Sequence, residues 1–282
     1  MAPQVHGSRR VMIRSTVAIA ILVVLWGLLN ALAFPHPNWW LLAYFALAPL
    51  ALAAVRAESV RRLAVITYLV GLVWWLVMVR WLTGVTLFGY IMLGFYMAVY
   101  PLGFVLLLRA ISFTLHVPMT FAVPLVWVGL EYVRGVAMTG FPWFCQGHSQ
   151  PTVMIQIADV VGVYGVSFVV AMTGGLIVDL LTQPLVKPGG GPGRTVFIGL
   201  VAWLGVLIVT LGYGKWRMSH LEVISDLSGL TVAVVQTDVP QSNKQYPDDT
   251  QQRQDFEAMV NLTRNAAAAA DRAGQTVDLY VW

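Results

Sequence analysis

Long apolar runs separated by short polar stretches fill residues 17–213. Seven such runs can be marked, and each is close to the roughly 20 residues that an α-helix needs to cross the hydrocarbon core of a bilayer. They are Val17–Phe34, Trp39–Val55, Leu63–Trp81, Val85–Leu108, Val117–Val133, Val160–Leu181 and Thr195–Tyr213. The pattern predicts a polytopic α-helical membrane bundle of about seven spans, in which the second and fifth are short.

After residue 228 the pattern becomes that of a water-soluble αβ segment. Leu230–Gln236 is rich in β-branched residues, a helical repeat runs from Pro247 to Gly274, and Thr276–Trp282 reads as a second strand. Such a βαβ unit normally joins two parallel strands by a right-handed crossover. One unit cannot cover both faces of its own sheet. Residues 229–282 are therefore predicted to be the first part of a larger domain, joined to the bundle by a linker at 214–228.

Composition supports the membrane assignment. Apolar residues make up 58% of the chain and charged residues only 11%, against roughly a quarter charged in an ordinary soluble domain. The net charge of +4 comes from basic residues scattered at the ends of apolar runs, so no basic patch for nucleic acid is expected. Cys145 is the only cysteine, which excludes an internal disulfide. Because no Cys/His group has zinc spacing, we expect neither a metal nor a cofactor.

Basic residues also predict the topology. The N-terminal segment 1–16 and alternate loops between the runs carry most of the arginines, and the other loops are poorer in Lys and Arg. The residues concerned are Arg9, Arg10, Arg14, Arg56, Arg61, Arg62, Arg109, Lys187 and Arg194. Loops rich in Lys and Arg stay in the cytoplasm. Segment 1–16 is therefore expected inside, and seven crossings would place residues 229–282 on the extracytoplasmic side.

The segment from Glu131 to Gln150 mixes aromatic and polar residues at the presumed outer water boundary. One interpretation is an aromatic belt with a tight turn at Gly140–Pro142, beside a simple i,i+3 pair of Glu131 and Arg134. The other is a lipid-facing groove under the outer segment, with Trp143, Phe141 and Glu131 as candidate substrate-binding residues. The residue pattern leaves both open.

Three further residues are candidates for chemistry. Cys145 and His148 suggest a cysteine nucleophile with its base, but no third orienting group is evident, and an apolar-flanked cysteine is more typical of a buried side chain. Asp179 lies inside the sixth run, where an acid is a functional candidate. Its place near the cytoplasmic boundary instead predicts a hydrated helix end.

Several motifs occur in an order that resembles one family. They are Trp39–Leu50, Gly140–Trp143, Gly147–Gln150, Ile155–Asp159, Gly162–Phe168, Val234–Gln236 and Val239–Ser242. Together they resemble the apolipoprotein N-acyltransferases over nearly the whole chain. The resemblance implies a bacterial inner-membrane bundle that carries an extracytoplasmic nitrilase-like αββα domain. It also implies transfer of an acyl chain from a phospholipid to the α-amino group of a diacylglyceryl-cysteine at the start of a lipoprotein.

The resemblance further implies a Glu-Lys-Cys triad that forms a thioester acyl-enzyme. In that family the second strand ends in Trp-Pro-Glu, whose glutamate is the general base, whereas this sequence stops at Trp282. None of the three triad positions is therefore expected among these 282 residues, and Cys145 in the membrane half does not match the nucleophile. The 282-residue chain is expected to be inactive by itself.

Two other functions fit a polytopic chain. A transporter or channel with a small outer appendage would need charges lining a path through the membrane, or paired broken helices. Asp179 is nearly the only charged candidate within a run. The chain could also be the accessory half of a split acyltransferase, completed by a second polypeptide that carries the triad.

Overall fold

A computed structural model describes residues 12–115, 117–183, 193–225, 229–239 and 248–282. The predicted topology residues Arg9, Arg10 and Lys187, the helix start at Pro247 and the end of the Val239–Ser242 motif lie outside the described residues. The chain divides into a helical unit of residues 1–82 and 87–219 and a smaller unit that includes His220–Trp282. Each is described by itself.

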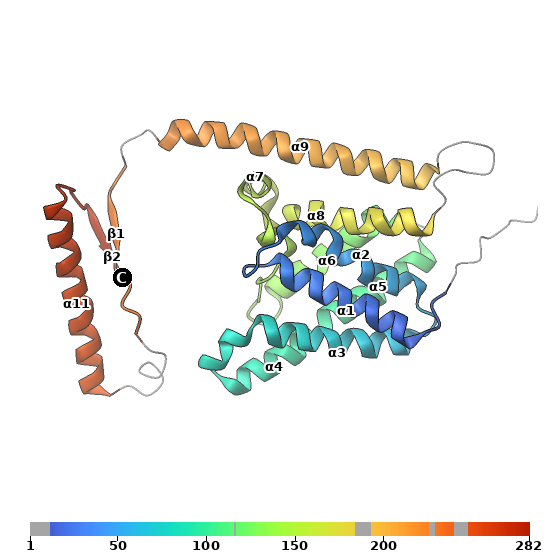
Figure 1. The fold of residues 1–282 in the computed structure, drawn as a ribbon, viewed down its shortest axis with the longest axis horizontal. Coiled ribbons are helices and arrows are strands. Elements are labelled where there is room, and N and C mark those ends of the chain that lie inside the picture. The colour runs from blue at the N-terminus through green and yellow to red at the C-terminus, as the bar shows by residue number, and fades with distance from the viewer. Residues whose placement is uncertain (1–11, 116, 184–192, 226–228, 240–247) are drawn as a thin grey trace, which may run out of the picture. The chain divides into compact units, whose positions relative to one another are not determined.

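The helical unit is a bundle of apolar helices (Figure 1). Its elements are α1 (Thr16–Ala33), η1 (Trp40–Leu42), α2 (Ala43–Arg56), α3 (Val60–Met78), η2 (Arg80–Gly84), α4 (Leu87–Met97), α5 (Val99–Thr114), α6 (Met119–Val136), η3 (Gln146–Ser149), α7 (Thr152–Ile155), α8 (Ala158–Thr182) and the greater part of α9 (Arg194–Ser225).

Each of the seven predicted runs contains a helix, which confirms the helical membrane bundle. Among the described residues, six helical segments are long and apolar enough to cross a membrane, with α4 and α5 counted as one. The second run, Trp40–Arg56, is shorter, and most residues of α2 are buried within the bundle. The apolar character of α2 therefore matches a helix surrounded by other helices. The count of seven spans stays a prediction.

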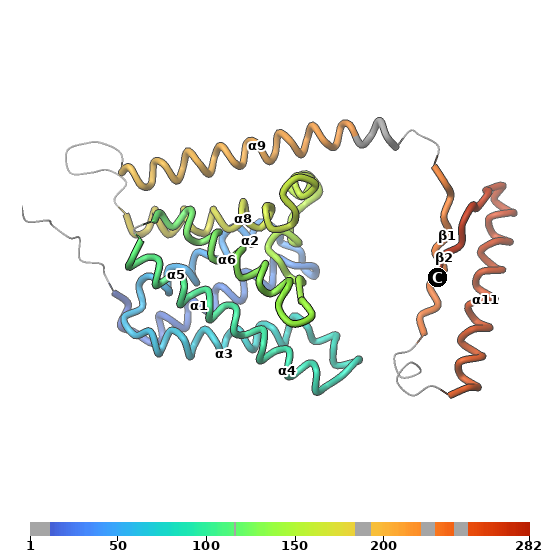
Figure 2. Tube along the Cα trace, turned by 180° about the vertical axis from the view of Figure 1, so that it is seen from behind, coloured from blue at the N-terminus to red at the C-terminus, as the bar shows by residue number. Residues whose placement is uncertain are grey.

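Small residues let three helices approach closely at the centre of the bundle. A Cβ atom added to Gly175 on α8 would lie 2.1 Å from the Met119 carbonyl oxygen, and one added to Gly174 would lie 3.0 Å from the Leu47 side chain. Trp203 of α9 also contacts α8, donating from Nε1 to Thr173 Oγ1 at 2.8 Å. Figures 1 and 2 both show α9 alongside α8. Close approach through small residues is typical of helix packing in membranes.

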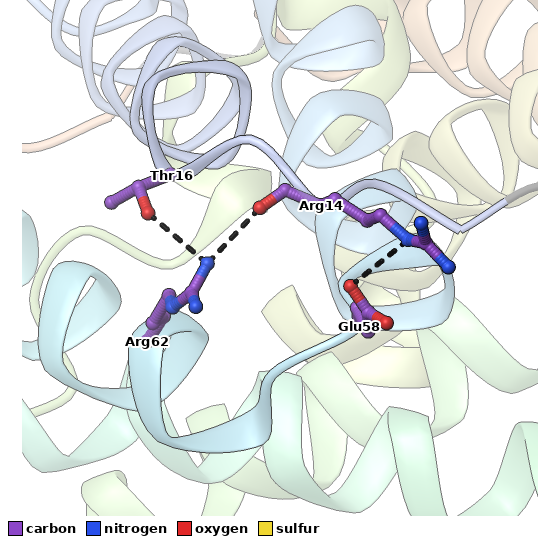
Figure 3. Close-up of polar contacts among 4 residues, drawn as sticks. All are labelled: Arg14, Thr16, Glu58 and Arg62. Carbon is purple, nitrogen blue, oxygen red and sulfur yellow. Dashed lines mark hydrogen bonds and ion pairs between the residues drawn. The ribbon is translucent and has the colours of Figure 1, made fainter.

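Arginines gather at one end of the bundle, where loops meet (Figure 3). Arg62 donates to the Arg14 carbonyl oxygen at 3.1 Å and to Thr16 Oγ1 at 3.4 Å, and Arg14 Nε lies 3.4 Å from Glu58 Oε2. Nearby, Arg109 donates to the carbonyl oxygens at the end of α2. These contacts bring the start of α1 to the α2–α3 loop and bind the helix ends together.

The smaller unit contains β1 (Val232–Val234), α11 (Asp249–Arg272) and β2 (Leu279–Val281). The strands pair in parallel, with Val232 opposite Leu279 and Val234 opposite Val281. This is the predicted order of strand, helix and strand, although both strands are shorter than their apolar runs. Gly274, with φ 64°, ends the helical segment as predicted. The apolar side chains of both strands remain substantially exposed.

Candidate functional site

The segment after α6 folds back over the end of that helix. Phe141 donates from its backbone N–H to the Arg134 carbonyl oxygen at 2.8 Å. The reversal requires glycine at position 140, because φ there is +77° and a Cβ would lie 2.3 Å from the Gly135 carbonyl oxygen. The Gly-Phe-Pro-Trp motif is thus a tight turn, and it presents Trp143 at the surface of the bundle.

This turn forms one wall of an open groove, which we call the outer groove. The groove has a volume of about 410 Å³ and is lined mainly by apolar atoms of Phe34, Pro35, Pro142, Trp143, Phe144 and His148. Trp143 is 51% exposed and stacks on Trp81, with ring centroids 5.2 Å apart, and on Phe141, at 5.9 Å. The structure therefore brings the predicted residues Trp143 and Phe141 together.

Glu131, the third predicted residue, does not line the outer groove. It is buried on α6, where its Oε1 accepts from Trp127 Nε1 and from the Gln146 backbone N–H, both at 2.8 Å. The buried carboxylate therefore holds the loop at Gln146 to α6. Gly147 adds a second tie, because its N–H donates to Ser167 Oγ on α8 at 2.9 Å.

Arg134 is buried beside Glu131 without forming the simple pair that the sequence suggested. No ion pair within 4.0 Å joins these two described residues, whereas Arg14 pairs with Glu58 and Arg217 with Asp159. Arg134 instead donates from Nη2 to the Cys145 sulfur at 3.6 Å, and its guanidinium lies 5.0 Å from the centre of the Trp75 ring. The i,i+3 pairing interpretation was wrong, because both side chains turn into the bundle.

Cys145 has none of the features of an activated thiol. Its side chain is fully buried, and its S–H donates to the Pro142 carbonyl oxygen at 3.3 Å. Burial, aided by the charge of Glu131 and opposed by Arg134, raises the pKa of this thiol to about 12. Burial also lowers the pKa of His148, and Arg134 adds to that effect. Reactive cysteines have lowered pKa values and exposed sulfur atoms, so this pair is unsuited to nucleophilic chemistry.

Asp179 corrects a second prediction. The sequence suggested a hydrated helix end, but the side chain is only 1% exposed. Its oxygens accept from the Met119 N–H at 2.9 Å, the Thr120 N–H at 2.8 Å and the Thr120 hydroxyl at 2.7 Å. The first N–H groups of a helix lack partners within the helix. Asp179 on α8 therefore caps α6 from outside, a contact between residues about 60 positions apart that local spacing does not reveal.

Comparison with known proteins places this arrangement in a family. Residues 26–176 match the profile of the apolipoprotein N-acyltransferase N-terminal domain, which covers more than half of the 282 residues. The chain belongs to the apolipoprotein N-acyltransferase family. The matched segment begins within α1, ends within α8, and includes the outer groove, Glu131 and Arg134.

Individual relatives extend the similarity along the chain. The apolipoprotein N-acyltransferase of Geobacter metallireducens is 33% identical over 93% of this chain and 50% of its own length. That of Rhodopirellula baltica is 28% identical over 95% of this chain and 47% of the relative, and that of Photobacterium profundum is 29% identical over 81% and 44%. The chain therefore spans about half the length of the curated relatives it matches.

Sequence reasoning missed the residues that surround Glu131 and Arg134 from other helices. They include Trp26 and Asn30 on α1, and Trp74 and Trp75 on α3. Asn30 could have been found, because a buried polar residue within an apolar span usually has a specific partner; here its Oδ1 accepts from Gln146 Nε2 at 3.2 Å. The described residues contain no group of three or more His, Cys, Asp or Glu side chains that could hold a metal ion.

Proposed function

We propose that this chain is the membrane region, with the start of the outer domain, of an enzyme that transfers an acyl chain from a phospholipid to the N-terminal diacylglyceryl-cysteine of lipoproteins. The observation that carries the proposal is the position of the family's Gly-Phe-Pro-Trp motif on an open apolar groove. In this proposal the outer groove binds lipid acyl chains, Trp143 contributes to its aromatic wall with Phe141 stacked against it, and Glu131 supports the loop from below.

Three properties of the outer groove suit an acyl chain. Its volume of about 410 Å³ lies in the range of small-molecule sites. Its lining is mainly apolar, and each buried methylene of a ligand contributes roughly 0.8 kcal/mol. Finally, the lining residue Trp143 is stacked on Trp81 and Phe141, so its ring is held rigid and loses little conformational entropy when a lipid binds.

The same proposal assigns a topology in the bacterial inner membrane. The end that carries Arg14, Arg56, Arg62 and Arg109 would face the cytoplasm, because basic residues are retained there. Residues 17–213 would cross seven times, 214–228 would form the linker, and 229–282 would begin a nitrilase-like domain outside. The parallel strands β1 and β2 with α11 between them support an α/β domain of this kind.

Lipid binding can be tested by photo-crosslinking. The 282-residue chain would be reconstituted in nanodiscs with phosphatidylethanolamine that carries a diazirine in one acyl chain, and crosslinked residues would be mapped by mass spectrometry. We expect crosslinks at Trp143 and Phe144 that saturate and are competed by unlabelled phosphatidylethanolamine and by a diacylglyceryl-cysteine peptide. The same peptide without lipid should not compete. Trp143→Ala should reduce groove crosslinking several-fold.

Leu125 provides the matched control for contact with bulk lipid. It is 60% exposed on α6 and lies outside the groove lining. Crosslinks there should rise in proportion to the probe and resist competition, and Leu125→Ala should leave groove labelling unchanged. Labelling at Trp143 that behaves like labelling at Leu125 would contradict a specific acyl site.

The topology can be tested with single cysteines in a Cys145→Ser background. Met138 is 83% exposed in the turn after α6, and Arg61 is exposed at the arginine-rich end. A membrane-impermeant maleimide added to spheroplasts should label Met138→Cys but not Arg61→Cys. In permeabilised cells the maleimide should label both cysteines. The reverse pattern would overturn the proposed orientation.

A further inference from the structure

A second, smaller space lies inside the helical unit, which we call the inner cavity. Its volume is about 20 Å³, and its lining includes Trp26, Asn30, Trp74, Glu131, Arg134 and Phe144. These residues come from α1, α3, α6 and the loop after α6. Phe144 lines both the inner cavity and the outer groove, so one aromatic ring borders both spaces.

Unpaired polar atoms concentrate on the residues of this cavity. Seven buried side-chain N or O atoms of the described residues have no protein hydrogen-bond partner. Four of them belong to residues that line the inner cavity, namely Trp26 Nε1, Trp74 Nε1, Glu131 Oε2 and Arg134 Nε. Gln146 Oε1 is a fifth, on the residue whose N–H binds Glu131. A buried polar atom without a partner is costly, and more so inside a bilayer.

The two charged residues strengthen the case for an occupant. Glu131 is 3% exposed and Arg134 is 5% exposed, yet no ion pair within 4.0 Å joins them, as described above. Buried charges are normally paired or bridged, because desolvation is otherwise uncompensated. The two side chains line the same small space, where one molecule can contact both.

We propose that the inner cavity is a binding site for a single water molecule that bridges Glu131 and Arg134. The volume suits one water, since roughly 10–15 Å³ measured this way is enough. The lining offers three unpaired donors, which are Arg134 Nε and the indole N–H groups of Trp26 and Trp74. It also offers one unpaired acceptor, Glu131 Oε2. Water is neutral, fits this volume, and both donates and accepts hydrogen bonds. A cation would meet the donors unfavourably and an anion the carboxylate, while one Glu and one Arg leave no net charge to balance an ion.

The bound water would join two helices below the outer groove. By accepting from an indole N–H of α1 or α3 and donating to Glu131, it would connect that helix to α6. Glu131 in turn holds the backbone of Gln146. The site therefore supports the inner wall of the groove at Phe144. The proposed water site is independent of lipid binding in the groove, because it rests only on the contacts within the bundle.

Direct observation is the first test. A cryo-EM map of the 282-residue chain in nanodiscs, bound to an antibody fragment and resolved well enough to show waters, should contain one peak within hydrogen-bond distance of both Glu131 and Arg134. A direct Glu131–Arg134 contact with no peak between them would overturn the proposal. So would a peak that strengthens when chloride is exchanged for bromide or sodium for rubidium, because it would identify an ion.

The second test removes the N–H group of one indole and measures the melting temperature of the protein. The analogue 3-benzothienylalanine has nearly the shape of tryptophan but carries sulfur in place of the N–H, and it can be placed at position 26 or 74. If a water accepts from these indoles, at least one of the two proteins should melt about 2–4 °C lower, the shift expected for one lost hydrogen bond. If the N–H groups are truly unpaired, removing them should leave the melting temperature unchanged or raise it.

Two positions calibrate the second test. Trp203 donates to Thr173 in a bond that the structure shows, so the analogue there should lower the melting temperature and give the size of a known loss. Trp143 is half exposed, and the analogue there should have little effect. Analogue proteins at 26 and 74 that are both as stable as the parent, beside a destabilised protein at 203, would overturn the proposal.

Discussion

Among the described residues of the helical unit two carboxylates are buried, one at each end of α6. Asp179 receives three hydrogen bonds shared between its two oxygens, all from the first residues of α6. Glu131, near the other end of α6, receives two on one oxygen, while its second oxygen has no protein partner among the described residues. Both oxygens of Asp179 therefore accept hydrogen bonds from the protein, whereas one oxygen of Glu131 can still accept a hydrogen bond from a bound molecule.

The surroundings of the two acids differ in the same sense. Asp179 lies where small residues bring α6 and α8 together, at Gly175. Glu131 lies beside the inner cavity, with Arg134 and several indole rings around it. A buried acid whose two oxygens both accept hydrogen bonds from the protein mainly fixes a fold, whereas one that keeps an unused oxygen in a cavity points to a binding site. The following variants test that distinction, from the largest effect to the smallest.

Gly175→Leu should have the largest effect, because it separates the helices that the Asp179 contact joins. Even the Cβ of the new side chain would lie 2.1 Å from the Met119 carbonyl oxygen, so α6 and α8 must move apart. We expect almost no folded protein by size-exclusion chromatography in detergent. Gly205→Leu on α9 is the control, since nothing lies within 4 Å of that position. Equal yields of the two variants would show that the α6–α8 contact tolerates expansion.

Asp179→Ala should follow, with a loss of about 2–4 kcal/mol in the free energy of unfolding. The change leaves two N–H groups and a hydroxyl at the start of α6 without acceptors. Reversible unfolding in mixed micelles would measure it. Asp159→Ala removes a partly exposed acid that pairs with Arg217 and Tyr213, and should cost no more than about 1 kcal/mol. Similar losses for both variants would contradict the structural role given to Asp179.

Isosteric amides sharpen the comparison further. In Asp179→Asn the new NH₂ group must face an N–H donor whichever way the amide turns, because both oxygens accept bonds from α6. In Glu131→Gln the amide oxygen can keep both existing bonds and turn its NH₂ toward the cavity. We therefore expect Asp179→Asn to retain most of the loss seen for alanine, and Glu131→Gln to cost about 1–2 kcal/mol, less than Glu131→Ala. If Glu131→Gln cost as much unfolding free energy as Glu131→Ala while Asp179→Asn cost little, Glu131 would not have an available acceptor oxygen.

Much of the fold, but little of this distinction, could be predicted from the sequence. Apolar runs identify helices because length and hydropathy are local properties, and the strand-helix-strand order after residue 228 follows from the change of pattern. The Gly-Phe-Pro-Trp turn and Trp143 could also be singled out locally. The roles of Asp179 and Glu131 could not, because Asp179 meets Met119 and Thr120 of another helix, and Gln146 reaches Asn30 across more than 100 residues. The short α2 shows the converse, since hydropathy does not separate a helix facing lipid from one surrounded by protein.

Cysteine chemistry reports the smallest difference between the two acids. With a pKa of about 12, roughly one Cys145 thiol in 10,000 is ionised at pH 8, so alkylation by iodoacetamide should be very slow in the folded protein and fast after denaturation. Burial is the main cause of the raised pKa, and the charge of Glu131 is the next. Glu131→Gln should therefore lower the thiol pKa and speed alkylation several-fold. Asp179→Asn should leave the rate unchanged while the protein is folded, because Asp179 is not among the groups that shift this thiol. Rates that rise equally in both variants would mean that alkylation proceeds through local opening of the bundle. The comparison would then be repeated at lower temperature, where opening is suppressed. A faster rate in Glu131→Gln alone must persist there.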